Sequence, residues 1–150
     1  MLYRGVVVPG DRLGRKLGYP TANLKISPDV LPKDGVYAGE VRGEKLSRVY
    51  IGAVSVGNKP TVAGEKRVFE VYIPGFKGNL YGSELQVSLI KKIRGQKKFA
   101  SIEELKRQIA EDVRKILSLK KEDRARDRQT PDRRKTSRLL GLKKSRPKKA

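Results

Sequence analysis

Apolar residues recur at every second position in short runs along the first two thirds of the chain, and Gly, Pro, Asn and Asp separate the runs. Such alternation is typical of strands with one buried face. The pattern predicts strands at 2–8, 23–26, 36–41, 48–55, 67–73 and 85–93. Because the connections are short and carry no helical pattern, we expect an antiparallel sheet that closes into a barrel.

The run RVFEVYI at 67–73 has two unlike faces. Val68, Glu70 and Tyr72 alternate with three apolar residues, and the pattern does not say which face is the inner one. Glu70 is therefore either solvated or held near a substrate. In the second case it could accept a proton from an attacking hydroxyl, as a phosphoryl-transfer enzyme requires.

One segment has helical spacing, from Ser101 to about Leu119. Ser101 is placed to cap the helix, and Glu104 three residues later completes a capping box. We expect the apolar stripe of this helix to lie against the barrel. The stripe consists of Ile102, Leu105, Ile109, Val113, Ile116 and Leu117.

The helical pattern lapses at residue 120, and 14 basic but only 4 acidic residues follow among the last 31. This composition cannot bury enough surface to offset its ordering entropy. We therefore expect a barrel with its helix at 1–119 and a basic, flexible tail at 120–150. The tail either is a solvated segment or contacts nucleic acid or another anionic surface.

Missing residue types narrow the chemistry. The chain has no Cys and no His, so thiolate sites, disulfides, the usual zinc ligands and a histidine base are excluded. No apolar run reaches the roughly 20 residues of a membrane span, and the N-terminus lacks the pattern of a signal peptide. These absences favour a cytoplasmic protein that uses carboxylates, hydroxyls, amides, Lys, Arg or a hard cation.

The segment GDRLGRKLGYPTAN at 10–23 is rich in glycine and positive charge. Its glycine spacing matches neither the Walker A motif nor the GxGxxG fingerprint. It is either a loop that presents N–H groups and cations to phosphate or an ordinary basic loop. The residues concerned are Gly10, Arg12, Gly14, Arg15, Lys16 and Gly18.

The end of this segment carries two oxygen donors, Thr21 and Asn23. On an extended backbone these two side chains point to the same face, and both offer the hard oxygens that Mg²⁺ prefers. Thr and Asn are also common turn residues. Farther along, Arg94 and Phe99 could hold a planar ligand, although Phe99 is better suited to anchoring the helix.

Taken in order, the segments LGYPTANL, LPKDGVYAGEV, VSVGNKPT, VFEVYI, LYGSELQVSLIKKIR and KKFASIEELKRQIAEDV resemble riboflavin kinase, the flavokinase family. The resemblance covers roughly residues 3–117. It implies a six-stranded antiparallel Greek-key β-barrel with a C-terminal helix. It also implies an ATP-dependent kinase that converts riboflavin to FMN and ADP.

The resemblance assigns roles to single residues. Thr21 and Asn23 would be the Mg²⁺ ligands, and Glu70 would be the general base that takes the proton of the terminal ribityl hydroxyl. The flavin-binding residues would be Asn23, Arg94 and Phe99. The nucleotide-binding residues would be Gly10, Gly14, Arg15, Lys16, Gly18, Pro20, Thr21, Leu80 and Tyr81.

Two departures and one alternative accompany the resemblance. Gly95 and Gln96 stand where the family often has Pro-Glu, so no acid is available there. In many bacteria the family's domain is the C-terminal half of a bifunctional FAD synthetase. The second departure is that the adenylyltransferase half is missing here, because its nucleotide motif needs histidines and this chain has none. A complete protein of this sequence would stop at FMN, whereas an excised domain would belong to a parent with an adenylyltransferase domain. The net charge of +20 also suggests a basic barrel that binds RNA, although the tail has no aromatic residue to stack on bases.

Overall fold

The computed structural model describes residues 1–129, apart from the side chains of Thr61 and of residues 120–129. Most of the predicted tail at 120–150 lies outside the described residues, and its boundary stays a prediction. The described chain divides into two compact units, with the first spanning Met1–Leu117 and the second beginning at Ser118. No helix within residues 1–129 has the length and apolar character needed to cross a membrane.

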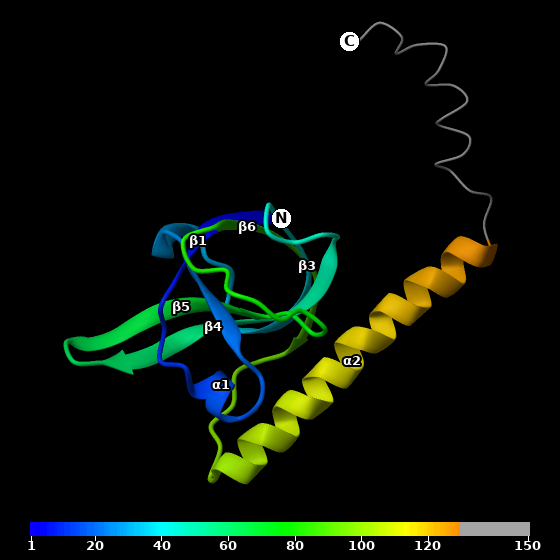
Figure 1. The fold of residues 1–150 in the computed structure, drawn as a ribbon. Coiled ribbons are helices and arrows are strands. Elements are labelled where there is room, and N and C mark those ends of the chain that lie inside the picture. The colour runs from blue at the N-terminus through cyan, green and yellow to red at the C-terminus, as the bar shows by residue number, and fades with distance from the viewer. Residues whose placement is uncertain (130–150) are drawn as a thin grey trace, which may run out of the picture. The chain divides into compact units, whose positions relative to one another are not determined.

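Six antiparallel strands close into a barrel (Figure 1). They are β1 (Leu2–Val8), β2 (Thr21–Lys25), β3 (Gly35–Gly43), β4 (Tyr50–Thr61), β5 (Gly64–Tyr72) and β6 (Glu84–Arg94). Their order around the barrel is β1-β2-β5-β4-β3-β6. Since β3, β4 and β5 are consecutive and β6 returns beside β3, the connection is a Greek key. The predicted architecture is confirmed.

The interior of the barrel is apolar, as the alternation predicts. Each strand sends every second side chain inward, and the larger fully buried side chains come from four of the strands. These are Val41, Val54, Val56, Phe69, Val71, Leu85 and Val87. The alternation in 67–73 is thereby resolved, because Phe69 and Val71 face the core and Glu70 does not.

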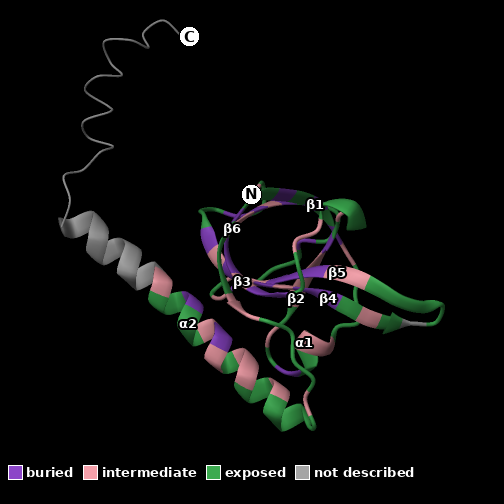
Figure 2. Cartoon of the chain, turned by 180° about the vertical axis from the view of Figure 1, so that it is seen from behind, coloured by how far each residue is buried: buried purple, intermediate pink, exposed green. Residues whose placement is uncertain are grey.

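The hairpin of β4 and β5 is longer than predicted. The predicted strand ends at residue 55, and the residues Gly57–Pro60 that follow have the composition of a turn, but β4 continues to Thr61 and pairs with β5 as far as Gly64. Cross-strand pairing therefore overrides the turn propensity of these residues. Figure 1 shows the hairpin extending beyond the barrel, and Figure 2 shows exposed residues toward its tip.

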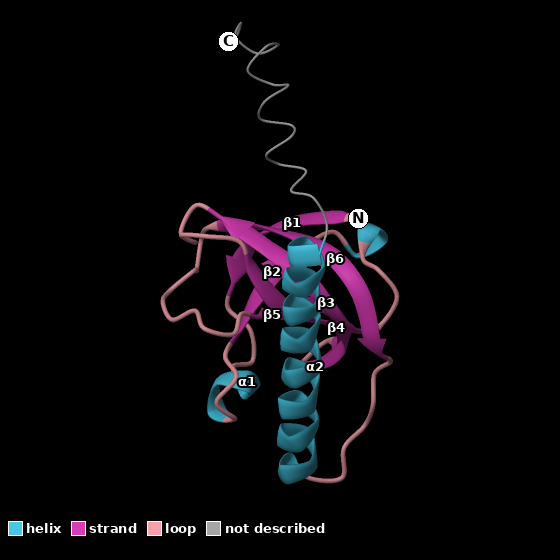
Figure 3. Cartoon of the chain, turned by 90° about the vertical axis from the view of Figure 1, so that its right-hand side faces the viewer, coloured by secondary structure: helices cyan, strands magenta, loops and turns pink. Residues whose placement is uncertain are grey.

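The loop between β1 and β2 contains one helical turn, α1 (Leu13–Lys16), which the sequence did not indicate (Figure 3). A short 3-10 helix, Pro28–Val30, was also not predicted. Both are single turns, too short to produce a periodic apolar pattern. Gly18 has a φ of +90°, a conformation that glycine adopts without strain, and it lets the chain turn from α1 toward β2.

The C-terminal helix, α2, spans Ile102–Gln129. Its predicted cap is confirmed, because the Ser101 hydroxyl accepts the Glu104 N–H at 3.1 Å and Glu104 accepts the Ala100 N–H at 3.1 Å. The predicted end near Leu119 is wrong, since helical backbone continues for another turn and more. The residues that continue it are strong helix formers such as Lys, Glu, Arg and Ala.

The predicted stripe on α2 needs one correction. Ile102 and Leu117 are 52% and 38% exposed, whereas Ile116 is fully buried. Asp112, four residues before Ile116, is also buried, at 3% exposure. The inward face of α2 within the first unit is therefore partly polar.

Candidate active site

Glu70 lies on the outer face of the barrel wall. It is directly opposite Asn23 of β2 and Ser55 of β4, and Thr21 is likewise opposite Tyr72. Directly opposed residues on neighbouring strands share a face, so these side chains form one outward group. The Glu70 side chain is nevertheless only 7% exposed. The barrel thus presents a covered carboxylate on its outside.

Both oxygens of the Glu70 carboxylate have a partner. The Thr21 hydroxyl donates a hydrogen bond to Oε1 at 3.1 Å, and the Lys59 ammonium lies 2.8 Å from Oε2. A buried carboxylate requires such partners, because an unpaired charge away from water is costly. The two contacts fix the carboxylate and leave it beside Thr21.

Lys59 also pairs with Asp11 in the loop before α1, with Nζ 3.0 Å from Oδ2. Burial alone would lower the pKa of Lys59, but Glu70 and Asp11 together raise it above its ordinary value. Burial alone would raise the pKa of Asp11, but the Leu13 N–H and Lys59 hold it below its ordinary value. Both groups are therefore charged at neutral pH.

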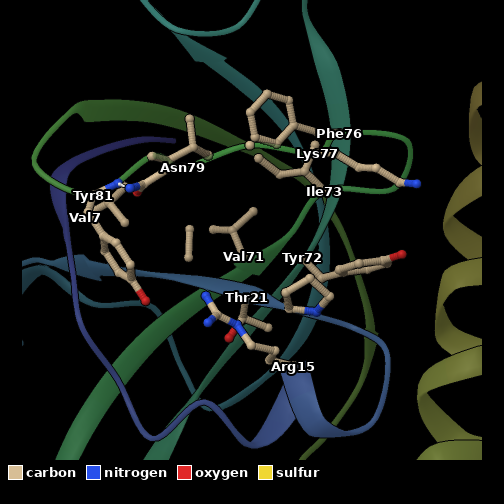
Figure 4. A pocket seen from close by; sticks show the side chains of 14 residues that line it. Val7, Arg15, Thr21, Val71, Tyr72, Ile73, Phe76, Lys77, Asn79 and Tyr81 are labelled. Carbon is tan, nitrogen blue, oxygen red and sulfur yellow. Dashed lines mark hydrogen bonds between the residues drawn. The ribbon is translucent and has the colours of Figure 1, made fainter.

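A cavity of about 500 Å³ opens beside β2 and the end of β5 (Figure 4). Arg15 and Thr21 lie on one side of it, and Phe76 and Lys77 lie on the other. Two cations at one cavity suit an anionic ligand such as a polyphosphate. Five of the residues predicted to bind nucleotide line this cavity: Arg15, Pro20, Thr21, Leu80 and Tyr81.

A second cavity, of about 270 Å³, is lined by residues from the loop between β1 and β2, from β5, from the segment after β6 and from α2. Glu70 and Lys59 line it, together with Gly14 and the two residues predicted to hold a planar ligand, Arg94 and Phe99. Its walls combine aromatic rings with charged groups. Such a lining suits a flat, polar ring system.

The two cavities share Thr21 and Tyr72. Tyr72 packs edge-to-face against Tyr19 with ring centroids 5.3 Å apart, so the end of the loop is held against β5. Burial, with Tyr19 nearby, raises the pKa of the Tyr72 phenol, which therefore stays protonated at neutral pH. The boundary between the cavities is thus a hydroxyl and a phenol, with Glu70 next to the hydroxyl.

Arg94 lines the second cavity with its guanidinium already engaged. Its Nε and Nη2 donate to Asp112 at 2.9–3.1 Å, and Nη1 donates to the Gly95 carbonyl at 3.0 Å. The guanidinium carbon lies 5.8 Å from the ring centre of Phe99. Arg94 therefore offers its planar face to a ligand, and Asp112 sets the orientation of that face.

Four of the predicted binding residues line neither cavity: Gly10, Lys16, Gly18 and Asn23. Gly10 lies directly against Asn23, since a Cβ on Gly10 would collide with the Asn23 amide. The N–H groups of Lys16, Leu17, Gly18 and Tyr19 donate to carbonyls within the loop. The contacts with nucleotide or flavin that the resemblance assigns to Gly10, Lys16, Gly18 and Asn23 stay predictions.

The donor set fits a Mg²⁺ ion that is shared with a phosphate. Mg²⁺ takes few protein ligands in such sites, and Thr21 lines both cavities. Asn23 is on the same face of β2, but its amide packs against Gly10. Among the side chains that the structure describes within residues 1–119, no cluster of three or more acidic, His or Cys groups suited to a metal occurs.

Sequence reasoning missed several residues of the site. Lys59 is not among the predicted residues, because Gly57–Pro60 has the composition of a turn. Lys59 follows Ser55 by four residues, so it lies on the outer face if the strand continues. Tyr72 alternates with Glu70 and could have been found in the same way. Asp112 stands at helical spacing from Ile109 and Ile116, which marks it as a buried acid.

The structure thus combines a small antiparallel barrel with a basic cavity, a second cavity lined by aromatic and charged residues, and a covered carboxylate at their boundary. Comparison with known proteins makes the assignment specific. The family model described as Flavokinase, riboflavin kinase, matches residues 1–119. The chain belongs to the riboflavin kinase family.

Individual relatives support the same assignment. The chain is 47% identical over 108 residues to the bifunctional riboflavin kinase/FMN adenylyltransferase of Escherichia coli K12, an alignment that covers 72% of this chain and 34% of that protein. A riboflavin kinase structure from Trypanosoma brucei superimposes with a TM-score of 0.60 at 27% identity and covers 84% of this chain and 83% of that one.

A second solved structure, described as a macrolide-efflux protein from Streptococcus pneumoniae, superimposes with a TM-score of 0.67 at 38% identity. It covers 75% of this chain and 37% of that one. The chain thus spans about a third of the length of the curated relatives it matches. The name of the bifunctional relatives includes an adenylyltransferase activity besides the kinase.

Proposed function

We propose that this chain is a riboflavin kinase, which transfers the γ-phosphoryl group of ATP to the 5′-hydroxyl of the ribityl chain of riboflavin and yields FMN and ADP. The observation that carries the proposal is the shared boundary of the two cavities. Thr21 lines both, and Glu70 lies 3.1 Å from its hydroxyl. A phosphoryl donor in one cavity and a hydroxyl acceptor in the other would meet beside a carboxylate.

The basic cavity takes ATP in this proposal. Arg15 and Lys77 would counter the charge of the phosphates, and Leu80 and Tyr81 would contact the nucleoside. The second cavity takes the flavin, whose ring would lie against Phe99 and the planar face of Arg94. The ribityl chain would then run toward Thr21 and Glu70.

Glu70 acts as the general base. The ribityl oxygen attacks the γ-phosphorus, the bond between that phosphorus and the β,γ-bridging oxygen breaks, and the hydroxyl proton passes to a Glu70 oxygen. The bridging oxygen leaves with its electron pair on ADP. Such a transfer depends chiefly on alignment and charge neutralisation, which the fixed carboxylate and the cationic cavity provide.

Thr21 and Asn23 are the oxygen donors that would hold Mg²⁺, and the bound ion would neutralise charge on the phosphate oxygens. Thr21 lines the basic cavity. Asn23 would need its amide turned away from Gly10. Asn23 is also the family's candidate for a contact to the flavin.

The test is a direct assay. The purified chain is incubated with riboflavin, ATP and MgCl₂, and flavins and nucleotides are separated by reversed-phase chromatography. We expect FMN and ADP to appear in equal amounts, and neither to form when EDTA replaces MgCl₂. Absence of FMN from a protein that melts cooperatively would contradict the proposal, and tight salt-sensitive RNA binding by that same protein would favour the basic-barrel alternative.

A further inference from the structure

Lys59 connects three parts of the site. Its ammonium lies 2.8 Å from Oε2 of Glu70 on β5 and 3.0 Å from Oδ2 of Asp11 in the loop before α1, while its backbone belongs to β4. The connection between β1 and β2 that contains Asp11 also contains α1 with Arg15, which lines the basic cavity. The Lys59 side chain therefore links the covered Glu70 carboxylate to the segment that lines the basic cavity.

The strand pairing explains how Lys59 reaches this place. Ser55 is directly opposite Glu70, and Lys59 follows it at a spacing of four on the same face of β4. Lys59 itself is opposite Lys66 in the extended part of the hairpin. Because β4 continues past Gly57, the hairpin carries a cation along the outer face, and the long Lys side chain turns back to Glu70.

We propose that Lys59 is a positioning residue for phosphoryl transfer, which holds the Glu70 carboxylate toward Thr21 and ties it to the loop through Asp11. The inference rests on the proposed kinase function. Glu70 has one oxygen on Thr21 and the other on Lys59, so the plane of the carboxylate is fixed by two different partners. Removing one partner frees the group to rotate.

Charge strengthens this geometry. Lys59 stands between two carboxylates, and without it Asp11 and Glu70 would face each other as like charges. Asp11 would then be driven away from β5 and would take the loop with it. Loss of Lys59 should thus affect the base and the phosphate cavity together, whereas loss of the Asp11 charge should affect only the loop.

These expectations define a kinetic test. Lys59→Met should lower kcat for FMN formation by about 10-fold to 100-fold, the range expected from a small displacement of a catalytic group, and should raise the KM for ATP. Lys59→Arg, which keeps the charge, should restore part of kcat. Lys66→Met is the matched control, since Lys66 is an exposed lysine directly opposite on the same hairpin, and its kcat should equal that of the unaltered chain.

A double-mutant cycle separates positioning from a general loss of stability. In a Glu70→Gln background, Lys59→Met should lower the residual kcat little further, because the group that it positions is already gone. Multiplying losses would show that Lys59 acts independently of Glu70 and would overturn the inference. Lys59→Gln is the second variant should Lys59→Met fail to fold, and an unchanged kcat in Lys59→Gln would overturn it too.

The outcomes also distinguish the inference from the function on which it rests. If the unaltered chain forms no FMN, the proposed kinase function fails. If it forms FMN and Lys59→Met turns over as fast as Lys66→Met, the kinase function stands and the role of Lys59 is refuted.

Discussion

Thr21 is the residue at which the two halves of the proposed reaction meet. Its hydroxyl donates to Glu70 at 3.1 Å, and it lines both cavities. The hydroxyl has one hydrogen to donate and lone pairs to spare, so it can bond to the carboxylate and still offer oxygen to a cation. A position with both abilities is restrictive, because only Ser and Thr supply them without added bulk.

Removing this hydroxyl should damage the use of Mg²⁺-ATP. We predict that Thr21→Ala raises the Mg²⁺ concentration needed for half-maximal FMN formation by about 10-fold, in line with loss of one ligand or its equivalent. Thr21→Ser keeps the oxygen and is the matched control, with metal dependence close to that of the unaltered chain. Equal metal dependence in all three proteins would count against the ligand assignment.

The ion pair of Asp11 and Lys59 should make stability depend on pH in a defined window. Folding lowers the pKa of Asp11 from 3.8, so its contribution is present above that value and is lost as the pH falls through the folded pKa. Folding raises the pKa of Lys59 from 10.5, so its contribution is present below that value and is lost as the pH rises through the folded pKa.

Asp11→Asn tests the acidic side of this window. Because both side chains are partly exposed, we expect a stability difference of under about 1 kcal/mol between the two proteins at neutral pH. Thermal melts across pH should show that difference shrinking as the pH falls below 3.8. A difference that stays constant from pH 7 to well below that value would mean that the Asp11 charge contributes nothing.

Among the elements, the β4–β5 hairpin and the loop before β2 convert a barrel wall into a site. The outer face of β2 and β5 would otherwise be an exposed polar surface. Tyr19 of this loop packs against Tyr72, and Asp11 of the same loop pairs with Lys59. The loop is thus attached to β5 and to β4 beside Glu70. These attachments account for the burial of Glu70 outside the core.

Arg94 at the end of β6 and Asp112 of α2 both line the second cavity and pair with each other. Their side chains are 14% and 5% exposed, and three hydrogen bonds of 2.9–3.1 Å join them. Gln108 also donates to Asp112 at 2.9 Å. A buried pair with this many bonds depends on both members, because the survivor of a deletion stays charged and buried.

We therefore predict that Asp112→Asn lowers the free energy of unfolding by about 3–5 kcal/mol and weakens flavin binding, since Arg94 loses its counter-charge and its orientation. Denaturant unfolding and flavin fluorescence titration measure the two effects. Glu111→Gln is the neighbouring control: Glu111 pairs on the surface with Lys115 at 3.4 Å, and its loss should cost about 0.5 kcal/mol or less. Equal stability losses in the two variants would refute the special role of Asp112.

For the whole molecule, the sequence predicted the barrel because strand alternation and turn residues are local signals. Phe69 and Val71 alternate with Glu70, and closure of the sheet followed from short connections. The capping pair Ser101 and Glu104 likewise predicted the start of α2. Resemblance to the family then singled out Thr21 and Glu70, which the structure brings into contact.

The remaining features depend on contacts between distant segments. Lys59 became part of the site only because pairing with β5 extends β4 past Gly57. The packing of Asn23 in β2 against Gly10, which follows β1, has no periodic signature. Whether Glu70 was covered could not be predicted either, since its cover comes from a loop attached by Asp11 and Tyr19.

The turnover of Glu70→Gln tests the assignment of Glu70 as the general base most directly. Gln keeps the size of the side chain and can still accept the Thr21 hydrogen bond, but it cannot take up a proton. We predict that kcat for FMN formation falls by about 100-fold or more while riboflavin binding, measured by flavin fluorescence, is largely retained. Glu65→Gln, on the exposed part of the same strand, should turn over normally. Full activity of Glu70→Gln would contradict the assignment of Glu70 as the base.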